Sequence, residues 1–346
     1  MPEKTPYLTV LIPTYNRARY LPEALDSVLN QADAEDIDYE VIVVDDGSDD
    51  DTVEILERDY TDSVRLIKLA HSGWPAVVRN AGMREARGEL IAFQDSDDVW
   101  VEDKLKSQLP DFDNPQVVLS YGNCDYITAD SQIEPEKTAI DNAIPPQGYA
   151  FMQKISRMAA PTPTPSVIIR RSVMDEIGLF NEKLRIATDT DYFIRIATLG
   201  DYSYCDKVLV HMRRDGSNIS ARPDETGDEA FYTHELNRID MFSHLRDELE
   251  LDDEEREALE FRIAELKRDV ADVAARLGKD VPFDPPSRKL PPKPHSLREI
   301  EDLYDATIAY GRLDNLLKTL LGWWPWLYVR LKRLARKAYR LMWRRA

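Results

Sequence analysis

The fold is decided by residues 89–98, which read Glu-Leu-Ile-Ala-Phe-Gln-Asp-Ser-Asp-Asp. The apolar run at residues 90–93 predicts a short buried strand. Three carboxylates follow it within four residues, at Asp95, Asp97 and Asp98. Because unpaired carboxylates are too costly to bury, they are expected beyond the strand's end. Such a cluster suits a hard divalent cation, Mg²⁺ or Mn²⁺, that also binds substrate phosphates. Taken alone, in so acidic a chain, it favours a solvated acidic turn.

Strands and helices alternate on both sides of this stretch. Apolar runs predict strands at residues 8–12, 40–44 and 64–69, each followed by a segment with helical spacing of apolar residues. The alternation predicts an α/β fold with βαβ units and a parallel sheet. Ligands of open α/β sheets bind outside the carboxyl ends of the strands. Polar segments follow four of the strands, at residues 13–17, 45–50, 71–74 and 95–98.

The rest of the chain predicts further strands and several helices. Residues 130–165 are rich in proline and polar groups, so we expect irregular loops there. Ser48 or Asp49 is expected to cap the next helix, and Asp189 can be read either as a functional carboxylate or as a helix N-cap. The expected strands cover residues 117–121, 166–170 and 202–210, and the expected helices cover 102–109, 172–178, 189–197 and 225–277.

The composition limits the class of protein. The 346 residues include 64 acidic and 45 basic ones, a net charge of -19. This charge makes nucleic acid an improbable partner, and an acidic excess is typical of proteins solvated in high salt, as in a halophile. Two cysteines, Cys124 and Cys205, form neither a disulfide framework nor a zinc motif. We expect no signal peptide and no membrane-spanning helix, since no sufficiently long apolar run occurs.

The C-terminal tail has the opposite charge. Between residues 312 and 346, ten basic residues oppose one acidic residue, Asp314. Residues 322–346 combine a Trp-rich start with an apolar stripe and a basic stripe, which is typical of a helix lying on an anionic membrane surface. The alternatives are a helix docked on the protein's own acidic surface or in a partner's groove. The expected segments are an α/β domain at 1–222, a charged helical extension at 223–281, a proline-rich linker at 282–295 and C-terminal helices at 296–346.

Taken together, the motifs resemble the family 2 glycosyltransferases, which are inverting enzymes of the GT-A fold. The resemblance covers about residues 8–220 and implies a Rossmann-like domain with a mixed sheet. Each motif is short, and their joint order and spacing carry the resemblance. The matching segments are 12–17, 44–48, 79–82, 86–89, 95–98, 178–180 and 189–191 with Arg195.

The resemblance also implies a role for individual residues. Asp189 would be the catalytic base, although Thr188 stands where many members have glutamate. Tyr15 would pack on the nucleotide base, and Asp46 would accept a hydrogen bond from it. Asp97, with His211 as a further candidate, would ligate the metal. The full nucleotide-binding set is Pro13, Thr14, Tyr15, Asp46, Arg79, Asp95 and Ser96. The residues for the diphosphate or the acceptor are Asp98, Trp100, Arg213 and Arg214, where a solvated turn at residues 211–214 is the alternative.

The implied function is transfer of a sugar from a UDP- or GDP-sugar to an acceptor hydroxyl, with Mn²⁺ or Mg²⁺ as cofactor. The acceptor would be a glycan or a lipid-linked glycan precursor, assembled at the cytoplasmic face of the cell membrane. Two alternatives are a polyprenyl-phosphate sugar synthase and a catalytically silent membrane-associated scaffold. A nucleotidyltransferase would need a glycine-rich loop near the N-terminus, and residues 13–17 contain no glycine.

Overall fold

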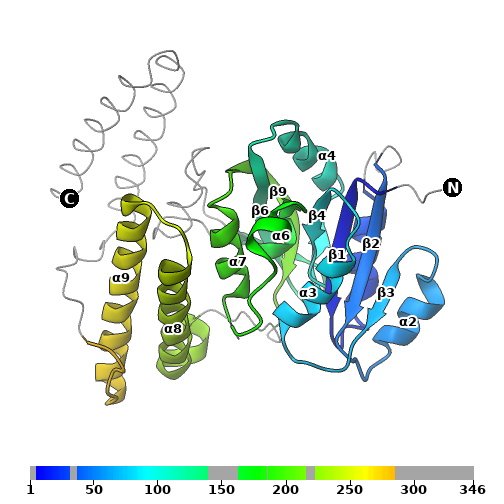
Figure 1. Cartoon of the computed structure of the whole chain (residues 1–346). Coiled ribbons are helices and arrows are strands. Elements are labelled where there is room, and N and C mark those ends of the chain that lie inside the picture. Colours follow the sequence, from blue (N-terminus) through cyan, green and yellow to red (C-terminus); the bar gives the residue numbers. More distant parts are fainter. Residues whose placement is uncertain (1–4, 32–36, 139–162, 185, 216–222, 285–346) are drawn as a thin grey trace, which may run out of the picture.

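The structure is a computed structural model, and it describes residues 5–31, 37–138, 163–184, 186–215 and 223–284 (Figure 1). Its centre is one sheet with the strand order β3-β2-β1-β4-β8-β6-β9-β5, and β7 pairs with β6 outside this path. The strands are β1 (Leu8–Thr14), β2 (Tyr39–Asp45), β3 (Arg65–Lys68), β4 (Leu90–Phe93), β5 (Val99–Trp100), β6 (Val117–Ile127), β7 (Ile133–Thr138), β8 (Ile168–Arg170) and β9 (Asp201–Arg213).

The sheet is parallel in its first half and mixed in its second. Strands β3, β2, β1 and β4 pair in parallel, which confirms the predicted βαβ units. Strand β8 is antiparallel to both β4 and β6, whereas β6 and β9 are parallel. The first four strands therefore end at the same edge, and so do the polar segments that follow them.

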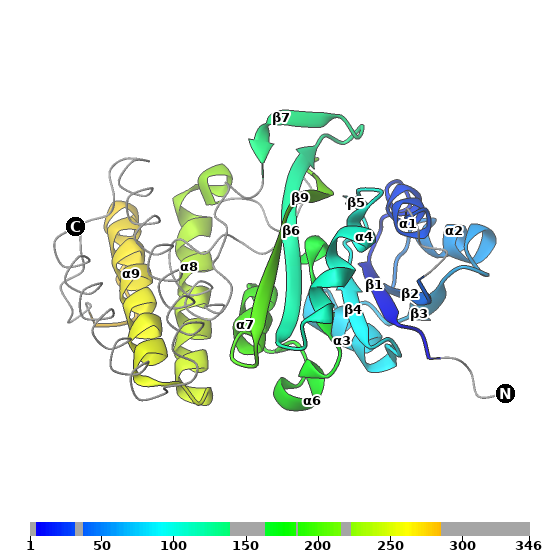
Figure 2. The same ribbon diagram turned by 90° about the horizontal axis from the view of Figure 1, so that it is seen from above.

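Helices cover both faces of the sheet (Figure 2). One face packs on α1, α2 and α4, and the other packs on α3, α6 and α7. Alternation along β1 explains this division, because Val10 and Ile12 lie in one core and Leu11 lies in the other. The helices of this domain are α1 (Leu21–Leu29), α2 (Thr52–Asp59), α3 (Pro75–Glu85), α4 (Lys104–Gln108), α6 (Val173–Ile177) and α7 (Thr188–Ile196).

The charged extension is a helical hairpin that packs beside α7 (Figure 1). The apolar spacing of residues 225–277 is confirmed as helical, and the chain there forms α8 (Pro223–Glu248) and α9 (Asp253–Leu277). Phe242 of α8 and Leu266 of α9 belong to the same buried cluster as Tyr192 of α7. The hairpin therefore shares a hydrophobic core with the α/β part of the chain.

Three local expectations were wrong. Part of the segment expected to be loop pairs with β6 as strand β7. Helix α2 begins at Thr52 after Asp51, too late for Ser48 or Asp49 to cap it. Asp189 is not an N-cap either, because Ala187 holds that position in α7.

The basic segment 322–346, the helices at 296–346 and most of the linker lie outside the described residues. Within the described part of the chain, the helices are all too short or too polar to span a bilayer.

Candidate functional site

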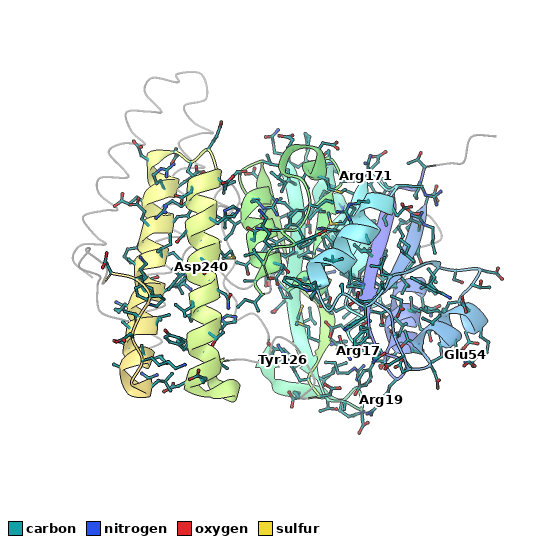
Figure 3. The ribbon with its side chains drawn as sticks, turned by 60° about the horizontal axis from the view of Figure 1, so that its bottom comes forward. Arg17, Arg19, Glu54, Tyr126, Arg171 and Asp240 are labelled. Carbon is teal, nitrogen blue, oxygen red and sulfur yellow. The ribbon has the colours of Figure 1, made fainter. Side chains whose placement is uncertain are left out.

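The candidate site lies at the edge where the parallel strands end. Figure 3 shows Arg17, Arg19 and Tyr126 at this end of the molecule and Arg171 at the opposite end. Asp45 shapes the turn after β2, because its carboxylate accepts hydrogen bonds from the backbone N–H of Gly47 and of Ser48. Gly47 has a φ of 74°, a left-handed conformation that favours glycine.

Asp46, the next residue, is buried and binds the segment after β3. Its Oδ1 accepts hydrogen bonds from the Ser72 backbone N–H at 2.9 Å and from the Ser72 hydroxyl at 2.8 Å. Its Oδ2 accepts one from the Gly73 N–H at 2.9 Å and lies 3.2 Å from His71 Nδ1. The His71 ring stacks on Tyr15, with ring centroids 4.1 Å apart and planes 23° apart. The expected base-binding pair, Tyr15 and Asp46, is thus brought together through His71.

The carboxylates after β4 face arginines from two other elements. The Nε of Arg17, in the turn after β1, lies 3.3 Å from Asp97 Oδ2. Arg79 of α3 donates a hydrogen bond to Asp95 Oδ1 at 3.2 Å. Burial raises the pKa of Asp97, and the nearby Asp95 carboxylate adds to this effect, while Arg17 opposes it. The turn therefore holds carboxylates that repel each other despite the two arginines.

The chemistry of this donor set fits a hard divalent cation. Asp95 and Asp97 offer carboxylate oxygens, the ligands that Mg²⁺ and Mn²⁺ prefer. A cation there would relieve the repulsion that raises the pKa of Asp97. The described residues hold no preformed group of three or more His, Cys, Asp or Glu ligands.

Asp98 and Arg213 are buried, and their hydrogen bonds stabilise the turn that follows β4. The Asp98 Oδ1 accepts a hydrogen bond from the Arg213 backbone N–H at 2.8 Å, and burial raises the pKa of Asp98 well above its usual value. The Arg213 guanidinium donates to the carbonyl oxygens of Asp97 at 2.8 Å and Thr128 at 2.9 Å and to Glu23 Oε2 at 2.6 Å. Only 1% of its side chain is exposed. Residue 213 is therefore not part of a solvated turn.

Asp189 lies in the first turn of α7, within hydrogen-bond distance of the short segment at Thr164–Ser166. Its Oδ2 accepts a hydrogen bond from the Thr164 hydroxyl at 3.3 Å. The next residue, Pro165, accepts a hydrogen bond from the Trp100 indole at 3.0 Å through its carbonyl oxygen. Trp100 comes two residues after the carboxylates that end at Asp98. A single short segment thus links the expected base to the expected metal turn.

The other expected site residues are spread along the same edge. Thr14 and His211 each carry a buried polar atom, Oγ1 and Nδ1 respectively, that has no hydrogen-bond partner among the described residues. His211 lies opposite Val99 in the sheet. The Arg214 guanidinium lies 4.9 Å from the centre of the Tyr126 ring. Pro13 is half-buried and Ser96 is buried.

Several residues at the site were not identified from the sequence. They are Arg17 and His71, described above, with Glu23, Tyr20 and Asp215. The Tyr20 hydroxyl donates a hydrogen bond to Asp215 Oδ2 at 2.8 Å, and Asp215 contributes to the raised pKa of Asp97. Arg17 and His71 fall within the polar segments after β1 and β3, so their position directly after a strand could have identified them as site residues. Glu23 and Asp215 depend on contacts across the sheet, which one sequence does not reveal.

The mixed sheet, with its polar residues at the ends of parallel strands, is a GT-A fold. Residues 9–178 match the family model of glycosyl transferase family 2. This part of the chain is a family 2 glycosyltransferase domain, as its motifs predicted.

Individual relatives agree with this assignment. The chain is 27% identical over 274 residues to a chondroitin synthase of Pasteurella multocida, a match that covers 77% of this chain and 27% of the relative. The chain spans about a quarter to a third of the length of the first curated relatives that it matches.

Solved structures have the same fold. TarS 1–349 of S. aureus in complex with UDP has a TM-score of 0.55 and 22% identity, over 96% of this chain and 91% of that chain. The mannosyltransferase PcManGT of Pyrobaculum calidifontis, in complex with GDP-Man and Mn²⁺, has a TM-score of 0.51 and 18% identity, over 98% of this chain and 86% of that chain.

Proposed function

We propose that this protein is an inverting, metal-dependent glycosyltransferase that moves a sugar from a nucleotide-diphospho-sugar to an acceptor hydroxyl. One observation carries the proposal. The Thr164–Pro165 segment contacts both Asp189 and Trp100, so one short segment connects a carboxylate that can accept a proton with the strand that directly follows the turn bearing Asp95 and Asp97. A sugar transfer that proceeds in one step needs these two chemistries side by side.

The donor would lie along the edge of the sheet, from β2 to β4. Tyr15 and Asp46 would hold the base, with Pro13, Thr14 and Ser96 beside it. Asp95 and Asp97 would hold the metal ion, with His211 as a further candidate ligand. When bound, a divalent ion would supply Lewis-acid neutralisation of the diphosphate. Support for a nucleotide sugar and a metal comes from the complexes of fold neighbours with UDP and with GDP-Man and Mn²⁺.

The reaction then needs one base and one set of cations. Asp189 takes the proton from the acceptor hydroxyl while that oxygen attacks the anomeric carbon. The bond from this carbon to the diphosphate breaks, and its electron pair leaves with the nucleoside diphosphate. Arg17 and Arg79 lie beside the carboxylate turn, where they can stabilise the leaving negative charge. Attack from the face opposite the leaving group inverts the configuration of the sugar.

The acceptor is proposed to be a growing surface glycan or its lipid-linked precursor. The similarity to a chondroitin synthase supports a glycan acceptor. The basic tail at residues 322–346 supports work at the inner face of a membrane, because such a segment binds anionic lipid. If this is correct, removal of residues 322–346 releases the protein from anionic liposomes in a flotation assay. Unchanged flotation would contradict the membrane role and leave the catalytic proposal intact.

The test of the catalytic proposal is a thermal-shift measurement with UDP, GDP and their sugars, each with and without Mn²⁺. A ligand present at a hundredfold excess over its Kd stabilises the folded state by about 2.7 kcal/mol, which is easily detected. A shift that requires the metal supports the donor site and identifies the base. If the folded protein shows no shift with the whole panel, including at high salt, the silent scaffold becomes the better proposal.

A further inference from the structure

His71 makes both contacts that the proposed function assigns to the nucleotide base. Its ring stacks on Tyr15 at a centroid distance of 4.1 Å. Its Nδ1 lies 2.9 Å from the Asp46 carbonyl oxygen and 3.2 Å from Asp46 Oδ2. Because both neighbours are acceptors, Nδ1 must carry the hydrogen. A flat ring with an N–H group is therefore already seated between Tyr15 and Asp46.

The Asp46 carboxylate has one acceptor position left, and the His71 ring lies against it. Each carboxylate oxygen has about two lone-pair sites. Oδ1 accepts two hydrogen bonds from Ser72 and Oδ2 accepts one from Gly73, while His71 Nδ1, which is hydrogen-bonded to the Asp46 carbonyl oxygen, lies 3.2 Å from Oδ2. A base can thus bind the Asp46 carboxylate only if the His71 ring moves away or one of the three other donors is replaced.

Among the four donors, the His71 ring is the one that can leave. Two are backbone N–H groups, and the Ser72 hydroxyl is itself held because it accepts a hydrogen bond from the Trp74 N–H at 3.1 Å. The His71 side chain is 48% exposed, so it has room to rotate outward. Its backbone packs closely against Gly47, where an added Cβ would lie 2.7 Å from His71 N. Rotation of the ring alone opens the position.

We propose that His71 is a built-in competitor for the nucleotide base, which must displace the imidazole ring from Tyr15 and Asp46 in order to bind. The inference rests on the proposed function, because it takes Tyr15 and Asp46 as the base-binding pair. A protein whose binding-competent state is only partly populated shows a correspondingly weaker apparent affinity. His71 therefore lowers the affinity for the nucleotide and speeds its release after transfer.

The experiment compares UDP and GDP binding to the full chain by calorimetry in the presence of Mn²⁺. His71→Ala removes the competitor, so the nucleotide that binds the wild type should bind this variant about three- to tenfold more tightly. His71→Phe keeps the aromatic ring but cannot donate to Asp46, so its affinity should lie between the two. If His71 is instead a second wall of the base site, His71→Ala binds more weakly and His71→Phe binds like the wild type. An affinity of His71→Ala that equals or falls below that of the wild type overturns the proposal.

A second measurement observes the His71 ring in the wild-type protein. In protein with ¹⁵N-labelled histidine, the Nδ1–H signal of His71, assigned by its absence in folded His71→Phe, should be visible in the free state and lost at saturating nucleotide. A signal that persists at saturation contradicts displacement. Absence of nucleotide binding by both the wild type and His71→Ala has a different meaning, because it rejects the proposed function itself.

Discussion

The Asp189 carboxylate accepts hydrogen bonds from the Thr164 hydroxyl and from the Thr190 backbone N–H. The asparagine oxygen can accept the bond from Thr190 N–H, and its amide NH₂ can donate to the Thr164 hydroxyl oxygen instead, so Asp189→Asn should leave the fold and donor binding unchanged. Loss of a general base typically costs 10²- to 10⁴-fold in rate. We therefore expect transfer activity to fall by about a thousandfold while the Kd for the donor stays within about twofold. Near-normal turnover of the folded variant would remove Asp189 from the role of base.

Asp97 should couple stability to pH in the opposite direction to a salt-bridged carboxylate. Its pKa is raised by burial and by Asp95, so the folded state binds this proton more tightly than the unfolded chain does. Asp97 stabilises the folded state most at low pH, below the ordinary pKa of a carboxylate. This stabilisation is lost as the pH rises from that value through the raised pKa of Asp97 in the folded state. Asp97→Asn removes the buried charge, so in metal-free buffer at neutral pH its unfolding midpoint should exceed that of the wild type. The same variant should lose the Mn²⁺-dependent shift. A lower unfolding midpoint would show that the buried charge of Asp97 does not destabilise the fold. A retained Mn²⁺-dependent shift would show that Asp97 is not a metal ligand.

At the scale of turns, two glycines with similar φ angles separate strain from crowding. Gly47 and Gly178 have φ values of 74° and 71°, but a Cβ at Gly47 would lie 2.7 Å from His71 N, whereas one at Gly178 would meet nothing within 4 Å. Gly178→Ala should cost about 1–3 kcal/mol from backbone strain alone, because its ψ of -149° lies in a region that is essentially confined to glycine. Gly47→Ala should cost about 2–4 kcal/mol, because the backbone of His71 must also shift. Urea unfolding measures both, and equal losses would contradict the crowding.

Removal of the buried Arg213 on β9 should lower the free energy of unfolding more than removal of Arg19, an exposed arginine that also contacts the turn after β6. Arg213 donates to Asp97 and Thr128 carbonyl oxygens with 1% of its side chain exposed, while Arg19 pairs with Asp130 at 63% exposure. Removing one member of a buried charged network typically costs about 3–5 kcal/mol, and an exposed pair contributes about 0–1 kcal/mol. Arg213→Ala should therefore lose far more unfolding free energy than Arg19→Ala. Similar losses for the two variants would mean that the Arg213 contacts contribute little.

Local patterns predicted most elements but not the ones that depend on distant partners. The apolar runs at 8–12, 40–44 and 90–93 formed parallel strands, because such runs are buried on both faces of a sheet. Strand β7 was missed since its polar sequence becomes a strand only by pairing with β6. The polar segments predicted the edge that holds the site. They could not show that Asp46 would be saturated by Ser72, Gly73 and His71, which depends on three-dimensional contacts.

At the scale of the whole molecule, the helical hairpin belongs to the same core as α7. Phe242 of α8 is 1% exposed within this core, whereas Asp240 on the same helix is exposed (Figure 3). We expect a single cooperative unfolding transition. Phe242→Ala should lower its free energy by about 3–5 kcal/mol, since it leaves a cavity, and Asp240→Ala should change it by less than about 0.5 kcal/mol. Two transitions, with only one affected by Phe242→Ala, would instead support an independent unit that begins after residue 222.

The pairing of β5 with β9 also has a consequence for how the protein is made. Val99 pairs with His211, so the turn that ends at Asp98 is held in place by a strand much later in the chain. Ribosomes add about 5–20 residues per second, which leaves the emerging acidic turn without its supporting strand for on the order of ten seconds. During the first part of that interval, until residue 170 has been made, β4 also lacks its neighbour β8. The nascent chain therefore passes through a stage in which sheet edges are unpaired, and chaperones that hold unfolded chains can bind these edges best at that stage. The site is complete only when β9, the last strand, has been made.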